Sequence, residues 1–113
     1  MAQLVTAVIK PFRVDDVKEA LKGLGIAGIT MTEVRGFGRQ GGHKETYRGS
    51  EYQVVFVPKV KLEVLATDED VQSVVEAIVG AASTGSIGDG KVWVTPVASV
   101  VRIRTGESGD AAI

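Results

Sequence analysis

A glycine-rich segment, Gly85 to Lys91 (GSIGDGK), holds residue types that proteins use to bind phosphate groups. Glycines let backbone N–H groups approach an anion closely, and the Lys91 ammonium adds a positive charge. The segment fits the G-x-x-x-x-G-K core of a P-loop, but Val92 stands where a P-loop has the Ser or Thr that binds magnesium. It also leads from a predicted helix into a predicted strand, the reverse of a P-loop. We therefore predict phosphate contact by a loop of another kind, with a simple helix end and turn as the alternative.

A second glycine pattern, Gly36 to Gly41 (GFGRQG), fits the G-x-G-x-x-G fingerprint after a predicted strand. No amphipathic helix follows it, so it is not the dinucleotide-binding motif of a Rossmann fold. It opens a longer segment, Gly36 to Tyr52, whose seventeen residues include five glycines and show neither helical nor strand periodicity. Such long loops in compact domains are usually functional or disordered, so we predict that this one carries the function. The alternative is a tolerated surface insertion.

Two arginines, Arg102 and Arg104, lie two positions apart on a predicted strand and are expected to project from the same face of it. Paired guanidinium groups at this spacing suit a polyphosphate, and the alternative is a solvent-exposed sheet edge. Lys59, on the polar face of its own predicted strand, supplies a further cation.

Groups that could catalyse a reaction are sparse. The chain has a single histidine, His43, and no cysteine, which argues against a metal cluster or a Ser/His hydrolytic site and excludes disulfides. The neighbouring carboxylates Asp15 and Asp16 are explained by the first turn of a helix, where they stabilise the helix dipole. Asp89 is the only candidate base near the predicted phosphate loop. We therefore predict a protein that is not an enzyme, and the rival hypothesis is an enzyme acting on nucleotides.

Hydrophobic periodicity predicts the elements that position these residues. The predicted strands span residues 4–9, 29–35, 59–64, 92–94 and 99–104. One helix is predicted with Asp15 and Asp16 in its first turn. A second helix follows a capping-box pattern at Thr67 and Asp70 and carries an apolar stripe from Val71 to Val79. Glycines in 84–91 end the second helix, and residues 105–113 are predicted to be a loose polar tail.

This order of elements predicts one α+β domain over residues 1–113 with the ferredoxin-like βαββαβ plan. Both helices lie on one face of an antiparallel sheet, a long loop joins strands 2 and 3, and an extra strand follows at the C-terminus. Because the first strand is apolar on both faces, we expect its second face to meet another subunit.

Composition excludes several other classes of protein. The net charge of −1 argues against a nucleic-acid partner, and an RNA-binding domain on the same plan would need exposed aromatic residues where this chain has only the isolated Trp93. Neither a signal peptide nor a membrane span is evident, so we expect a soluble cytoplasmic protein.

Five segments together closely resemble the PII signal-transduction proteins of nitrogen regulation. They are KPF near residue 11, GFGRQ at 36–40, YRGSEY at 47–52, TGSIGDGKVWV at 84–94 and VRIRTGE at 101–107. The resemblance covers nearly the whole chain. It implies a homotrimeric sensor that binds ATP or ADP in clefts between subunits.

The resemblance also implies the nucleotide site. The matching positions are Val8, Gly28, Ile29, Thr30, Gly36, Phe37, Gly38, Arg39, Gln40, Glu63, Leu65, Thr84, Gly88, Asp89, Gly90, Lys91, Arg102 and Arg104. Among them, residues 88–91 and 38–40 correspond to the phosphate cradle of one subunit, and Arg102 and Arg104 to cations from its neighbour. Thr30, Glu63 and Leu65 match positions around the adenine and ribose.

Family members that hold Mg²⁺-ATP also bind 2-oxoglutarate, with the Gln40 side chain on the metal and the Lys59 ammonium on the ligand. The matching positions are Lys10, Gln40, Gly41, Gly42, Lys59 and Gly88. This chain has Gly41 where the family commonly has a lysine that contacts the oxoglutarate carboxylate, and Lys10 could supply a compensating charge. Ser86 stands where many members have Lys or Glu, at a loop position expected to be tolerant.

The long segment from Gly36 to Tyr52 corresponds to the T-loop of the family, which docks on target proteins. Implied partners are an ammonium transporter, a modifying nucleotidyltransferase and enzymes of nitrogen metabolism, and the transporter would recruit a cytoplasmic protein to the membrane. Tyr52 matches a tyrosine that is nucleotidylated in many members, and Ser50 matches a serine phosphorylated in cyanobacterial ones.

Overall fold

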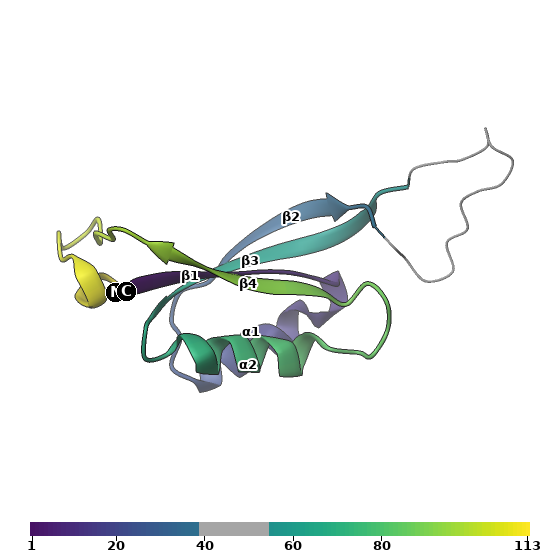
Figure 1. Cartoon of the computed structure of the whole chain (residues 1–113), viewed down its shortest axis with the longest axis horizontal. Coiled ribbons are helices and arrows are strands. Elements are labelled where there is room, and N and C mark those ends of the chain that lie inside the picture. Colours follow the sequence, from purple (N-terminus) through teal and green to yellow (C-terminus); the bar gives the residue numbers. More distant parts are fainter. Residues whose placement is uncertain (39–54) are drawn as a thin grey trace, which may run out of the picture.

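The computed structural model describes residues 1–38 and 55–113, which form a four-stranded antiparallel sheet and two α-helices. The strands are β1 (Ala2–Ile9), β2 (Thr30–Gly36), β3 (Val57–Thr67) and β4 (Gly90–Val97), in the spatial order β2-β3-β1-β4. The helices α1 (Val14–Gly23) and α2 (Val71–Ala82) cover the same face of the sheet (Figure 1). The predicted ferredoxin-like α+β fold is confirmed.

The core lies between this face and the two helices, because the side chains alternate along the strands and recur every three or four residues along the helices. Its buried members from the strands are Val5, Ala7, Ile9, Val60, Leu62, Val64 and Ala66. The helices contribute Val17, Leu21, Val74, Ile78 and Ala82. Within the described residues, neither helix has the length and hydrophobicity needed to cross a membrane.

The ends of the helices follow local sequence signals. Asp15 and Asp16 lie in the first turn of α1 as predicted, and Gly25 follows that helix with a positive φ of 85°. The capping box predicted at the start of α2 is formed only in part. The Thr67 hydroxyl accepts a hydrogen bond from the Asp70 N–H at 3.2 Å, but the Asp70 side chain makes no capping bond. Thr67 is the last residue of β3, and a three-residue turn separates it from the helix.

The prediction of an extra strand at residues 99–104 is wrong for the single chain. Only an isolated bridge between Val101 and Ser108 occurs there, and the chain reverses at Gly106, whose φ is 75°. Because the N–H groups of Arg102 and Gly106 bond within this turn, the segment satisfies its backbone locally instead of pairing with the sheet. The tail is also not loose, since Gly109–Ala112 form a 3₁₀ helix.

Candidate functional site

The face of the sheet opposite the helices, which we call the open face, carries several of the predicted binding residues in neighbouring rows. One row runs across the strands from Thr30 through Glu63 and Thr6 to Trp93. The next contains Lys61, Val8 and Lys91. Two residues along a strand separate the rows by about 7 Å. Thr30 is therefore at the β2 edge of this face, and Lys91 is at the β4 edge.

A hollow of about 720 Å³ lies where the open face meets the loop before β2 and the C-terminal tail. Five of the predicted nucleotide-binding residues line it, namely Gly28, Ile29, Thr30, Glu63 and Leu65. The tail residues Asp110, Ala112 and Ile113 line the same hollow. Sequence reasoning missed them because nothing in a short polar tail indicates where it packs.

The glycine-rich loop is organised around the Asp89 carboxylate. One of its oxygens accepts hydrogen bonds from the backbone N–H groups of Thr84 and Gly85, at 2.7 and 2.9 Å. The other accepts one from the Thr84 hydroxyl and forms an ion pair with Lys10 Nζ at 3.1 Å. Hydrogen bonds from the Thr84 side chain and backbone, followed by those from Lys10 and Gly85, hold the pKa of Asp89 far below its usual range. Asp89 is therefore an anchor for the loop and is not available as the catalytic base that the rival hypothesis required.

Lys59, predicted on the polar face of its strand, lies beneath this loop and is only 8% exposed. Its Nζ donates a hydrogen bond to the Gly88 carbonyl at 2.5 Å. Its stem packs beside Gly36, where an added Cβ would lie 3.4 Å from Lys59 Cγ. Burial lowers the pKa of Lys59, and the nearby Lys10 ammonium lowers it further, against an opposing effect of Asp89. Lys10, Lys59 and Gly88, predicted from separate parts of the chain, are thus brought together.

Gly90 begins β4 at a point of close backbone approach. Its φ is 104°, and a Cβ added there would lie 1.8 Å from the carbonyl oxygen of Val8. Only glycine fits this position, which holds the adjoining Lys91 against β1.

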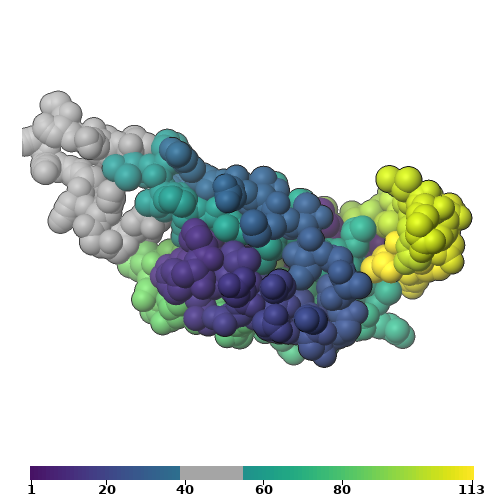
Figure 2. All heavy atoms as spheres, turned by 180° about the vertical axis from the view of Figure 1, so that it is seen from behind, coloured from purple at the N-terminus to yellow at the C-terminus, as the bar shows by residue number. Residues whose placement is uncertain are grey.

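Arg102 and Arg104 do not share a strand face as predicted, because no strand forms there. Arg102 donates to the Glu107 carboxylate at 3.0 Å and to the Ile113 carbonyl at 3.1 Å, whereas the Arg104 side chain is exposed. Both follow the far end of β4, and its eight residues place Val97 about 20 Å from Lys91. Figure 1 and the opposite view in Figure 2 show the tail at one end of the molecule and the glycine-rich loop at the other. In one chain these cations do not converge.

The remaining predicted residues divide into two groups. Phe37 and Gly38 continue from the end of β2, and the Phe37 ring lies 5.7 Å from that of Phe56 between ring centroids. The other predicted residues lie outside the described ranges, namely Arg39, Gln40, Gly41, Gly42, Ser50 and Tyr52. Within those ranges, no group of three or more His, Cys, Asp or Glu side chains could hold a metal ion.

The fold and this site define a class: a ferredoxin-like α+β domain with charged side chains and glycine-rich backbone gathered at one end of its sheet. The family model described as "Nitrogen regulatory protein P-II" matches residues 2–107. A Nitrogen regulatory protein P-II of Klebsiella oxytoca is 60% identical over 109 residues, covering 96% of this chain and 97% of that protein. One of Azospirillum brasilense is 62% identical with the same coverage.

The fold is also similar to the solved structure of Arabidopsis thaliana PII bound to citrate. The TM-score is 0.82 and the sequence identity is 40%, and the match covers 99% of this chain and 92% of that one. The chain belongs to the P-II family of nitrogen regulatory proteins. It is accordingly a regulatory protein and not an enzyme.

Proposed function

We propose that the protein is a homotrimeric sensor that binds ATP or ADP, with Mg²⁺ accompanying ATP, and 2-oxoglutarate in clefts between subunits. The observation that carries this proposal is the separation of Lys91, near the start of β4, from Arg102 and Arg104, which follow the far end of that strand. A nucleotide needs an adenine and ribose pocket and several phosphate-binding cations in one place. A second copy that brings its tail to the glycine-rich loop supplies that arrangement.

The effector 2-oxoglutarate would bind beside the nucleotide, at the cluster formed by Lys10, Lys59 and Gly88. Two ammonium groups within reach of one loop suit a dicarboxylate. The citrate named for the Arabidopsis relative is also a carboxylate ligand, which supports this class of effector. In this proposal the Gln40 side chain contacts the metal. Gly41 stands where the family commonly has a lysine, and Lys10 supplies the positive charge in its place.

The output is the segment Gly36 to Tyr52, which would report effector binding to target proteins. We place the protein in the cytoplasm, with recruitment to the membrane through an ammonium transporter. The other proposed targets are a modifying nucleotidyltransferase and enzymes of nitrogen metabolism, and Tyr52 and Ser50 are alternative modification sites. The Lys59 stem lies beside Gly36, so effector binding at Lys59 would adjoin the start of this segment.

Calorimetric titration tests the central claim. We expect ATP to bind without magnesium, though more weakly, and 2-oxoglutarate to bind only when Mg²⁺ and ATP are both present. By linkage, 2-oxoglutarate then tightens Mg²⁺-ATP by the same factor by which Mg²⁺-ATP tightens 2-oxoglutarate. Equal affinity for 2-oxoglutarate with and without nucleotide would exclude the proposed shared site.

The lowered pKa of Lys59 gives this binding a characteristic pH dependence. An anion requires the ammonium form, so the affinity for 2-oxoglutarate should fall as pH rises through the Lys59 pKa, below the ordinary value of 10.5. The free energy of unfolding should show the opposite trend in that window, because the unfolded chain there binds more protons than the folded one. Both trends, measured by calorimetry and by denaturation, should be absent from a Lys59→Met variant, so the difference between wild type and variant isolates the contribution of Lys59. Identical pH profiles for the stability of the two proteins would contradict the assignment.

A further inference from the structure

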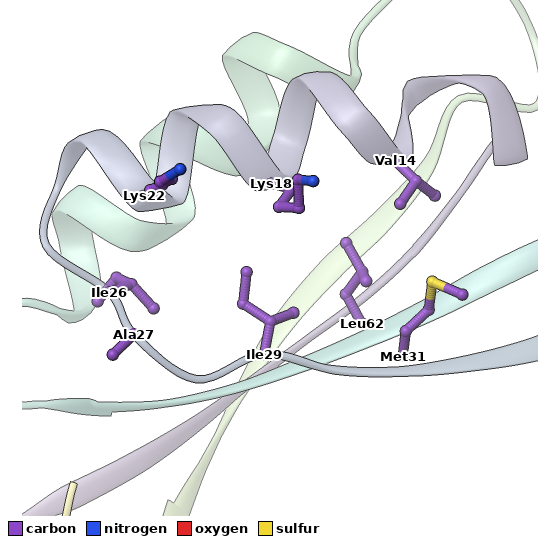
Figure 3. A pocket seen from close by; sticks show the side chains of 8 residues that line it. All are labelled: Val14, Lys18, Lys22, Ile26, Ala27, Ile29, Met31 and Leu62. Carbon is purple, nitrogen blue, oxygen red and sulfur yellow. The ribbon is translucent and has the colours of Figure 1, made fainter.

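A groove on the helical side of the sheet is lined by apolar residues and two lysines, and it is separate from the cluster of Lys10, Lys59 and Gly88. It lies between α1 and β2, has a volume of about 480 Å³, and is bordered by the residues labelled in Figure 3. Ile29, Met31 and Leu62 form an apolar floor across the groove from α1 (Figure 3). Its size falls within the usual range for small-molecule sites. We call it the α1–β2 groove.

Two lysines, Lys18 and Lys22, border this groove from α1. They are four residues apart and so lie one helical turn from each other on the same side of the helix. Within residues 1–38 and 55–113, neither ammonium group forms an ion pair. The groove thus combines an apolar floor with two positive charges along one margin.

We propose that the α1–β2 groove binds an aliphatic monocarboxylate, the chemistry of a fatty acid. An alkyl chain would pack on this floor and remove the exposed surface of Ile29 and Met31 from water, while Leu62 beneath them is already buried. The carboxylate would lie between Lys18 and Lys22, where two charge-assisted hydrogen bonds are available. Charge complementarity selects this ligand over a neutral or cationic alkyl compound.

The site is independent of the proposed effector cluster but is not remote from the open-face hollow. Ile26, Ala27 and Ile29 line both the groove and that hollow, so a single loop segment separates the two. A ligand in the groove would contact this segment directly.

The two methionines of the chain make the test specific, because only Met31 lines the groove. The full-length protein carrying ¹³C-methyl methionine is titrated with decanoate below its micelle concentration and followed by NMR. Met31 is 52% exposed, so its methyl group is accessible to the ligand. We expect a saturable shift of the Met31 signal with the Met1 signal unchanged. The absence of a Met31 shift up to the solubility limit, or equal shifts of both signals, would overturn the proposal.

Two controls separate the charge from the apolar contribution. Lys18→Gln with Lys22→Gln should weaken decanoate binding about tenfold, since both charge-assisted contacts are lost. Gln72→Glu with Ser73→Glu changes the net charge equally on α2 and should leave the affinity for decanoate unchanged. Decanol should bind wild type and the lysine variant with the same affinity. Thermal melts verify that each variant is folded, and equal decanoate affinity in the lysine variant and wild type would refute the role of the lysines.

Discussion

Gly90→Ala should be among the most destabilising single substitutions in this chain, lowering the free energy of unfolding by about 3 kcal/mol or more. The new Cβ would lie 1.8 Å from the Val8 carbonyl oxygen, which is backbone and cannot rotate away. The positive φ of 104° adds strain for any residue with a side chain. Relief requires β4 to move away from β1, which displaces Lys91 as well. Chemical denaturation measures the loss, and ATP titration of the folded fraction should show that binding is lost too.

Gly85→Ala is the control, because both glycines have a positive φ but only Gly90 lacks the space for a side chain. Gly85 also has a positive φ, of 84°, but an added Cβ meets nothing within 4 Å. We expect a cost of about 1 kcal/mol from backbone strain alone. If Gly90→Ala costs no more than Gly85→Ala, the close approach of Gly90 to Val8 is not what requires glycine there.

Lys91→Ala and Arg102→Ala should each weaken ATP binding by roughly 1.5–3 kcal/mol, the scale of a lost charge-assisted hydrogen bond. Lys91 lies near the start of the eight-residue strand β4 and Arg102 follows its far end, so under the proposed function they act on a nucleotide from two subunits. Mixing the two variants should therefore restore some binding sites. In a mixed oligomer, an intact Lys91 from one chain can face an intact Arg102 from another. Calorimetry of each variant and of the mixture measures the recovered stoichiometry.

Two checks make this complementation decisive. Ser73→Glu lowers the net charge by the same amount on the exposed side of α2 and should leave ATP affinity unchanged, which separates local contact from long-range electrostatics. Subunit exchange is verified by differently tagged chains. If mixed oligomers form but no sites return, the cleft is not shared between subunits in the proposed way.

The sequence by itself determined the parts of the molecule that depend on short-range periodicity. The apolar alternation of residues 4–9 predicted a strand, of which Val5, Ala7 and Ile9 form the buried face. The stripe from Val71 to Val79 predicted the core-facing side of α2, where Val74 and Ile78 are buried, although Val79 at its end is 51% exposed. These patterns are readable because a side chain's direction repeats every two residues in a strand and every 3.6 in a helix. The element order then predicted the ferredoxin-like plan, which the structure confirms.

Only the tertiary structure decided where the charged groups are placed. Lys59 has the spacing of a residue on the polar face of its strand, yet it is buried and bonds the Gly88 carbonyl, 29 residues away. Asp89 is neutralised by Lys10, which arrives from the end of β1. Arg102 and Lys91 are separated by the length of β4, although each belongs to a sequence pattern typical of phosphate-binding sites. Such contacts depend on strand pairing and on which loop covers which side chain, and local periodicity carries no information about either.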